Sequence, residues 1–224
     1  MSMKETDNTT NINVHWPKFY QGRTLEAQLT VDREPNSESL NVVIPWSSKR
    51  FQFTSKQVAL PVSGMISWSE GNYQMQSRDS FATLDFGRGK WPYQSKWNWG
   101  AASGFVDGYR IGLNFGGQWT EGTGQTENGL IIDSKLNKLH DELDWIYDKQ
   151  DYMKPWVINS PNDHRVKLMF EPLFERVSKT NLGFIKSNVH QMIGYYSGTI
   201  EADDGRIIQI QRLLGWAEDH EARW

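Results

Sequence analysis

The sequence predicts an all-β protein whose strands form an antiparallel barrel. Two observations support this fold class. Short segments with alternating apolar side chains recur along the chain, and turn-forming residues separate them at short intervals. Segments with helical periodicity are few, which argues against a helical layer.

Six segments have the clearest strand patterns, with apolar residues at alternate positions. Residues 137–147 fit either an amphipathic helix or strands, and the β-forming side chains of 143–147 favour a strand there. One helical turn is expected at 217–223. The six strand segments are 24–31, 40–45, 50–54, 81–86, 165–170 and 206–214, and turn signals lie at 34–36, 71–72, 107–108, 128–129 and 204–205.

Composition and charge exclude several classes of protein. The net charge is -3 and the basic residues are scattered, so a nucleic-acid partner is not expected. The chain has no cysteine, which excludes disulfides and thiolate chemistry and is typical of a cytoplasmic protein. No apolar run reaches the ~20 residues of a transmembrane helix. Residues 1–13 are polar and are expected to be a disordered lead-in rather than a secretory signal.

Tryptophan is the compositional outlier, with 11 copies in 224 residues. Two interpretations are open for these indoles: bulky packing within the barrel, or the lining of a cavity for an apolar or ring-bearing ligand. The chain length suits one large β domain, or one full barrel with part of a second.

One hairpin can be aligned from the sequence, because Asp107-Gly108 is a strong type I′ turn signal. Val106 then faces Tyr109, and every earlier residue has a defined partner. The face of interest carries two indoles beside small residues. We expect this face to look into the cavity. The alternative is that its glycines make room for the indole rings across the strand pair. Its members are Trp97, Trp99, Ala101 and Ser103, opposite Gln118, Gly116, Asn114 and Gly112.

Two sequence segments contain candidate polar groups for chemistry. Asp85 and Arg88 are expected to pair across the glycine turn after a strand, either as a structural salt bridge or as a carboxylate for acid–base catalysis. The loop 116–128 lacks the spacing of a phosphate-binding loop. Its best polar candidates are Glu127 and Asn128, at the predicted mouth of the barrel.

The five histidines show no metal-binding spacing, so neither a metal nor a cofactor is expected. If Asp204-Gly205 closes a two-residue hairpin, His190 lies opposite Asp219 and beside Glu218. A histidine–carboxylate pair can shuttle a proton near neutral pH. The alternative is a hydrogen bond on the surface or between domains.

Long segments of the chain carry a family resemblance: IPWSSKRFQFTSKQVALPVSG, DFGRGKWPY, WNWGAASG, DGYRIGLNFGGQWTEGTGQTENGL, HQMIGYYSG and GWAEDHEARW. They resemble the family catalogued as domain of unknown function 2804, over residues 14–224. That family is distantly similar to a lipocalin-like group, with carotenoid hydratases and tocopherol-cyclase-like proteins, built from paired antiparallel barrels. The resemblance implies a lipocalin-like barrel here, with a partial first barrel or sheet over 14–92 and a second barrel over 93–224.

The leading functional hypothesis is binding of an apolar, lipid-like or isoprenoid-like small molecule. Its site would have indole walls and a few orienting polar groups. The candidate residues for this site are Trp97, Trp99 and Trp119 as walls, with Asn98, Asn114, Asp85 and Arg88 as polar groups.

Two alternatives remain open. One is a cofactor-independent hydratase, cyclase or isomerase, with Asp85, Glu127 and His190 as candidate acid–base residues. The other is a structural or protein-interaction module. Carboxylates that face the tryptophans would favour the enzyme, whereas asparagine and serine alone would favour a binding protein. The oligomeric state does not follow from the sequence.

Overall fold

The computed structural model describes residues 1–223, which form sixteen strands and no helix. All strand pairs are antiparallel, and they make two sheets of seven and nine strands. The predicted all-β, antiparallel, barrel-like fold is confirmed. Within the described residues there is consequently no helix of the length and apolarity needed to cross a membrane.

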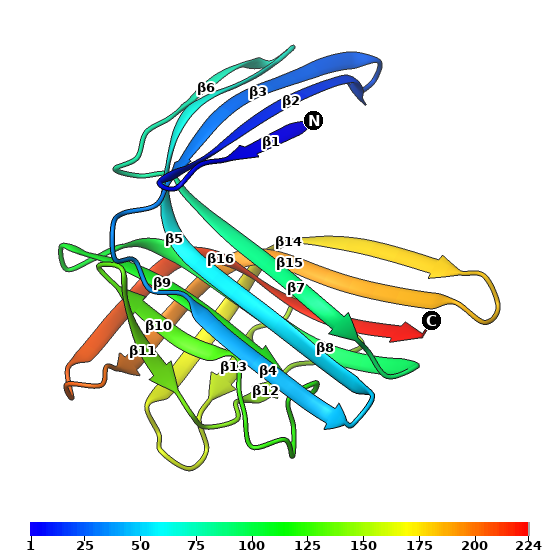
Figure 1. Cartoon of the computed structure of the whole chain (residues 1–224), viewed down its shortest axis with the longest axis vertical. Coiled ribbons are helices and arrows are strands. Elements are labelled where there is room, and N and C mark those ends of the chain that lie inside the picture. The colour runs from blue at the N-terminus through cyan, green and yellow to red at the C-terminus, as the bar shows by residue number, and fades with distance from the viewer. Residues whose placement is uncertain (224) are drawn as a thin grey trace.

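The first sheet is organised around one strand of 19 residues, β5. The second half of β5 pairs with β3 and β6, and its first half pairs with β4 and β7 (Figure 1). The seven strands are β1 (Ser2–Glu5), β2 (Thr9–Tyr20), β3 (Arg23–Asp32), β4 (Leu40–Ser47), β5 (Arg50–Trp68), β6 (Gly71–Met75) and β7 (Phe81–Lys90).

The second sheet curves into a half-barrel, in the strand order β11-β10-β9-β8-β16-β15-β14-β13-β12 (Figure 1). Its concave side encloses the main hydrophobic core, which includes Phe115, Trp156, Phe170 and Tyr196. Its strands are β8 (Gln94–Val106), β9 (Tyr109–Gly117), β10 (Asn128–Ile132), β11 (Lys135–Leu139), β12 (Asp144–Ile146), β13 (Trp156–Asn159), β14 (Val166–Asn181), β15 (Lys186–Glu201) and β16 (Ile207–Arg223).

The chain ends differ from the sequence-based expectation. Residues 1–13 form β1 and the start of β2 rather than a disordered lead-in, because β1 pairs with β2 and β2 pairs with β3, which orders this polar segment. The helical turn expected at 217–223 is wrong. These residues continue β16, which pairs on both sides, with β15 and with β8. The strand predicted at 143–147 is confirmed as β12.

The register of the β8–β9 hairpin is as predicted, with Val106 opposite Tyr109. Asp107 and Gly108 both have positive φ, 51° and 85°, as a type I′ turn requires. One face of the hairpin contributes Ile111 and Leu113 to the half-barrel core. The other face, with the indoles and glycines, packs against the first sheet.

The two sheets contact each other where β5 crosses β8 and β9. A Cβ atom on Gly112 would lie 2.5 Å from a methyl carbon of Val58, so glycine is required for this approach. The backbone N–H of Ala59 donates to Ser103 Oγ at 3.0 Å, which adds a polar link between the sheets. At this end, therefore, the glycine face is solidly packed, but Gly112 makes room for Val58 and Ala59 of the first sheet and not, as the second interpretation expected, for an indole ring.

An ion pair closes the same end of the interface. Arg110 of β9 donates to both carboxylate oxygens of Glu34, at 2.7 and 2.6 Å. The hydrogen bonds from Arg110 and Ser134 lower the pKa of Glu34 to about 2. Between the sheets, the chain passes from Lys90 at the end of β7 to Gln94 at the start of β8. The division into domains at residues 92 and 93 stays a prediction.

We expect Gly112→Val to destabilise the protein by about 1–3 kcal/mol, the usual cost of overpacking. The added methyl groups would push β9 away from Val58. Urea unfolding monitored by circular dichroism measures the change. Met169→Val, at an exposed position of β14, is the control and should stay within about 0.5 kcal/mol of the parent. Equal stability of both variants would contradict close packing at Gly112.

Candidate functional site

A pocket of about 180 Å³ lies between the two sheets, beyond the solidly packed end. Strands β5 and β7 form one side of it, and β8, β16 and the loop before β10 form the other. Its lining combines indoles with ionisable groups. The lining residues are Gln52, Thr54, Lys56, Asp85, Trp91, Trp97, Trp99, Trp119, Glu127 and Glu218.

The first half of β5 turns a polar face toward the second sheet. Gln52, Thr54 and Lys56 are buried, whereas Phe51 is exposed and Phe53 is half-buried on the opposite face. The alternation predicted for 50–54 is present, but its polar residues are the ones that line the site. Sequence analysis therefore missed Lys56. The pattern that points to it is that Lys56 follows Gln52 and Thr54 at alternate positions and so shares their face of the strand.

Lys56 holds the site together electrostatically. Its side chain is buried, and its Nζ lies 2.9 Å from Asp85 Oδ2 and 3.3 Å from Glu127 Oε2. The ammonium group also sits 4.2 Å from the centre of a Trp99 ring, a cation–π contact. Asp85 lies directly opposite Lys56 in the β5–β7 register, whereas Glu127 directly precedes β10 of the second sheet. One ammonium group thus connects both sheets.

Asp85 is at the rim of the pocket, with 39% of its side chain exposed. Thr54 Oγ1 donates to its Oδ1 at 3.0 Å. The predicted pairing of Asp85 with Arg88 is wrong, because β7 continues through both residues instead of turning. Residues three apart on a strand point to opposite faces, so Arg88 is exposed on the side away from the pocket.

Glu127 is the most enclosed carboxyl group of the pocket, at 2% exposure. The indole N–H of Trp119 donates to its Oε1 at 2.6 Å. Burial raises the pKa of Glu127, and the neighbouring Lys56 only partly opposes this effect. The structure therefore places a carboxyl group with a raised pKa against an aromatic wall.

Glu218 is a second buried carboxyl group, and it lies directly opposite Trp99 on β16. It accepts hydrogen bonds from Trp97 Nε1 and Gln191 Nε2, both at 3.0 Å. Burial raises the pKa of Glu218 as well. Sequence analysis used Glu218 only as a neighbour of the His190 pairing, since its face depends on the β8–β16 register.

Four indoles form a continuous aromatic wall. The ring centres of Trp91 lie 5.4 Å from those of Trp97 and 5.2 Å from those of Trp119. Trp46 of β4 extends the wall, with its ring centre 5.0 Å from that of Trp91. The predicted walls Trp97, Trp99 and Trp119 therefore come together in one pocket.

Asn114 supports the pocket from behind rather than lining it. Its Oδ1 accepts from Trp99 Nε1 at 2.9 Å, and its Nδ2 donates to the backbone carbonyl of Glu127 at 2.7 Å. Gly116 is equally constrained, since a Cβ there would lie 2.2 Å from Glu127 Cγ. Both residues fix the position of Glu127, and the glycine makes room for its carboxyl group.

Asn98 does not face the pocket, contrary to the sequence expectation. Its neighbours Trp97 and Trp99 point to one side of β8, so strand alternation turns Asn98 to the other. Inside the half-barrel its Nδ2 donates to Tyr147 Oη at 3.1 Å, and its Oδ1 accepts from Gln118 at 2.7 Å.

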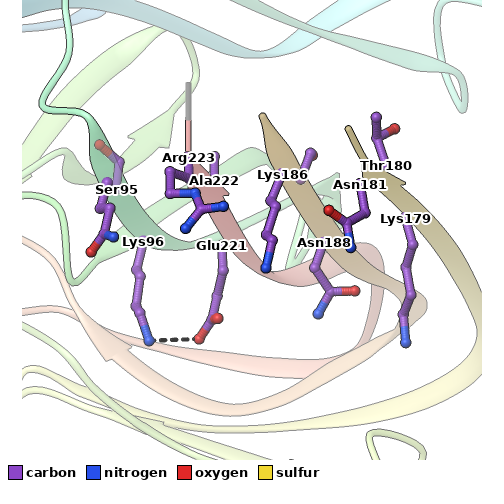
Figure 2. Close-up of a pocket in the computed structure, with 12 residues that line it drawn as sticks. Ser95, Lys96, Lys179, Thr180, Asn181, Lys186, Asn188, Glu221, Ala222 and Arg223 are labelled. Atoms are coloured by element: carbon purple, nitrogen blue, oxygen red, sulfur yellow. Dashed lines mark hydrogen bonds and ion pairs between the residues drawn. The ribbon is translucent and has the colours of Figure 1, made fainter. Parts of the chain in front are cut away.

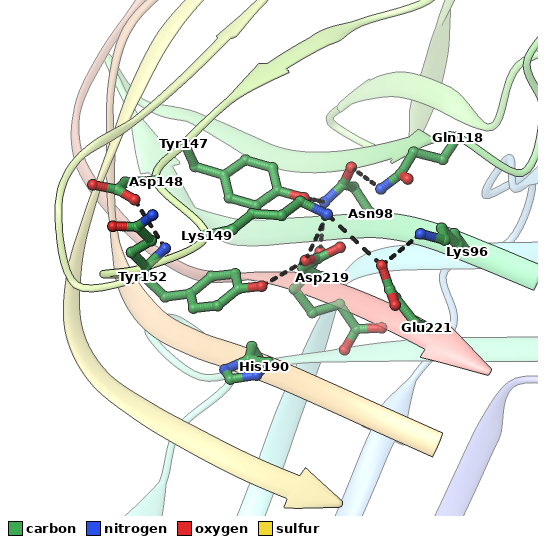
Figure 3. Close-up of polar contacts among 12 residues, drawn as sticks. Lys96, Asn98, Gln118, Tyr147, Asp148, Lys149, Tyr152, His190, Asp219 and Glu221 are labelled. Atoms are coloured by element: carbon green, nitrogen blue, oxygen red, sulfur yellow. Dashed lines mark hydrogen bonds and ion pairs between the residues drawn. The ribbon is translucent and has the colours of Figure 1, made fainter. Parts of the chain in front are cut away.

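His190 belongs to the same interior cluster as Asn98 (Figure 3). The predicted register, His190 opposite Asp219, is confirmed. However, Nδ1 of His190 lies 2.6 Å from Glu175 Oε1, and its ring stacks on Tyr152 at 4.2 Å. Tyr152 in turn donates to Asp219 Oδ2 at 2.8 Å. The structure therefore separates His190 from the indole-lined pocket by the thickness of the sheet.

The pocket combines three carboxyl groups with a single ammonium group. Lys56 can balance one of these charges, so the site favours at least one neutral carboxyl group. Glu127 is the most deeply buried of the three, and burial raises its pKa against the opposing effects of Lys56 and of the Trp119 hydrogen bond. Among residues 1–223, no set of three histidine, cysteine, aspartate or glutamate side chains is arranged to hold a metal ion. What the arrangement can do is proton transfer to a molecule held against the indoles.

The raised pKa of Glu127 makes a prediction for stability. Because its folded pKa lies above the ordinary 4.5, its stabilising contribution is present at low pH and is lost as the pH rises through the folded pKa. Glu127→Gln mimics the neutral acid at every pH. We expect the variant to gain stability relative to the parent, by about 1.4 kcal/mol for each pH unit in this window. Urea unfolding midpoints of the variant and the parent, recorded from acidic to neutral pH, measure this gain. A stability difference that does not change with pH would contradict the raised pKa.

Comparison with known proteins gives a family but no characterised relative. No match to a curated protein was found. A family model, described as Domain of unknown function (DUF2804), matches residues 1–224 and hence the whole chain. The chain therefore belongs to the DUF2804 family.

Proposed function

We propose that the pocket between the sheets is an acid–base active site for an apolar, unsaturated small molecule, without a cofactor. One observation carries this proposal: the buried carboxyl group of Glu127, held by Trp119, faces a pocket of indoles and lies beside Lys56. Carboxyl groups among the tryptophans are the feature that favours an enzyme over a simple binding protein.

The size of the pocket limits what it can hold. Its 180 Å³ is below the roughly 300–1,000 Å³ of pockets that enclose a whole drug-sized ligand. A terminal ring or double bond of a longer molecule fits better. An open trough of about 360 Å³ shares Trp91 and Trp119 with the pocket and continues past Trp46. This trough can carry the rest of an elongated apolar ligand.

The proposed chemistry uses the groups in their observed positions. Glu127 donates its proton to one carbon of a double bond, and the positive charge develops on the other carbon. The face of Trp119 stabilises that charge by cation–π attraction. The cation then takes up water and loses a proton to a carboxylate, with Asp85 at the rim as the acceptor, or it closes a ring or loses a neighbouring proton. Hydration, cyclisation and isomerisation are the corresponding outcomes.

The fold agrees with this proposal at the level of analogy. The half-barrel is in keeping with the lipocalin-like relation suggested by the sequence, and that group includes carotenoid hydratases. Function is carried by the site and not by the fold, and here the site is the pocket. The absence of cysteine is in keeping with a cytoplasmic location, which we include in the proposal.

The proposal is tested by identifying what the protein carries. We expect native mass spectrometry after mild extraction to detect a bound apolar molecule. Prolonged incubation with it should produce an isomer, or a product heavier by one water. Geraniol and β-ionone, a linear and a ring-bearing isoprenoid, are suitable added probes for quenching of tryptophan fluorescence.

Glu127→Gln should retain the ligand and lower turnover by roughly 100-fold or more, because general acid catalysis is usually worth that much. Gly116→Ala should lower turnover too, since the new methyl group displaces the carboxyl group. Glu26→Gln, at an exposed position of β3, is the control and should leave turnover unchanged. A ligand that binds but is never converted would contradict an enzyme and indicate a binding protein. A pocket that is always empty would favour a structural module.

A further inference from the structure

A polar groove of about 750 Å³ lies on the same face as Asn98 and His190, at the outer end of β8, β14, β15 and β16. Its side chains form two rows across the four strands, because residues directly opposite in an antiparallel sheet share a face. The first row is Lys96, Glu221, Asn188 and Lys179, and the second is Gln94, Arg223, Lys186 and Asn181.

The groove is strongly positive. Four cations, Lys96, Lys179, Lys186 and Arg223, face one carboxylate, Glu221, so its net charge is +3. The whole chain has a net charge of -3. Figure 2 shows that Lys96, Lys179 and Lys186 extend to the same side of their strands. Of the four cations, only Lys96 forms a salt bridge among the described residues, at 2.7 Å from Glu221, which also lies 3.9 Å from Lys149 outside the groove.

The hairpin between β14 and β15 ends in an apolar tip. Leu182 and Phe184 are 66% and 71% exposed, and Ile185 beside them is also exposed. The backbone N–H of Leu182 donates to the carbonyl of Ile185 at 2.8 Å, so part of the turn's polar backbone is already satisfied. Large apolar side chains at a protruding tip are costly in water unless another phase covers them.

Hydrogen bonds fix the tip beside the groove. Arg223 donates to the carbonyl of Gly183, and Tyr93 Oη donates to the carbonyl of Phe184 at 3.2 Å. The flanking residues Asn181 and Lys186 line the groove themselves. Apolar side chains and a cluster of cations are therefore presented together at one end of the half-barrel.

We propose that this end of the protein docks on the surface of an anionic lipid bilayer. Leu182, Phe184 and Ile185 would enter the interface between headgroups and acyl chains, while the lysines of the groove contact lipid phosphates. Charge complementarity and the apolar tip point to the same occupant, since a basic surface beside exposed Leu and Phe is what interfacial binding requires. A free phosphate compound would use the cations but leave the tip exposed to water.

The groove and the indole-lined pocket are adjacent without being the same site. The open trough beside Trp91 and Trp119 also contains Gln94 and Lys96, which line the groove. Docking would therefore bring the trough close to the membrane, where apolar molecules dissolve. The docking proposal does not depend on the proposed chemistry, because it rests on different residues.

Vesicle co-sedimentation tests the proposal with the full chain. We expect binding to vesicles of phosphatidylcholine with phosphatidylserine, weaker binding at high salt, and little binding to phosphatidylcholine alone. Lys179→Gln with Lys186→Gln should weaken binding by roughly 30-fold, since each basic residue near an anionic surface is worth about 1 kcal/mol. Leu182→Ser with Phe184→Ser should weaken it by roughly tenfold or more through lost apolar burial.

The controls are Lys18→Gln with Lys49→Gln, two exposed lysines of the first sheet, and Ile207→Ser, an exposed apolar residue at the start of β16. All variants should keep the melting temperature of the parent, because the changed side chains are exposed. Equal vesicle binding by groove, tip and control variants would overturn the proposal. Binding of inorganic phosphate or diphosphate by calorimetry, without vesicle binding, would overturn it as well.

Discussion

The structure depends most on one buried ammonium group. Lys56 is in the first sheet, but one of its two carboxyl partners, Glu127, lies in the loop that leads into β10 of the second. Removing both carboxyl groups would leave uncompensated a charge that is only 5% exposed, and uncompensated buried charge is among the costliest defects in a fold. The same contact that links the two sheets therefore also brings two carboxyl groups and an indole face around one small cavity.

The interface between the sheets divides into two parts with different roles. Around Gly112 and Val58 it is packed without space, as a hydrophobic core is. Around Gly116 the space freed by a missing side chain is occupied by the carboxyl group of Glu127. Two glycines on one face of β9 thus serve different ends: one permits close packing, and the other permits a buried acid.

The sequence predicted those parts of the site that lie on a single hairpin better than those that depend on contacts between the two sheets. Trp97, Trp99 and Gly116 could be placed on one face because a two-residue turn fixes the register of β8 and β9. Asn98 and Arg88 failed for a simple reason, since strand alternation turns each away from the residues it was expected to join. Lys56 was missed because nothing near it in the chain shows that the polar face of β5 is the buried one.

The sequence by itself determined the all-β class, the positions of most strands, the β8–β9 register and the indole-rich character of the pocket, because these follow from alternation and turn chemistry. Tertiary structure alone decided which face of β5 meets the half-barrel, and with it the meeting of Lys56, Asp85, Glu127 and Glu218. The physical reason is that these residues come from two sheets and from a loop between strands, and side-chain alternation gives the two faces of a strand without saying which of them another sheet will cover.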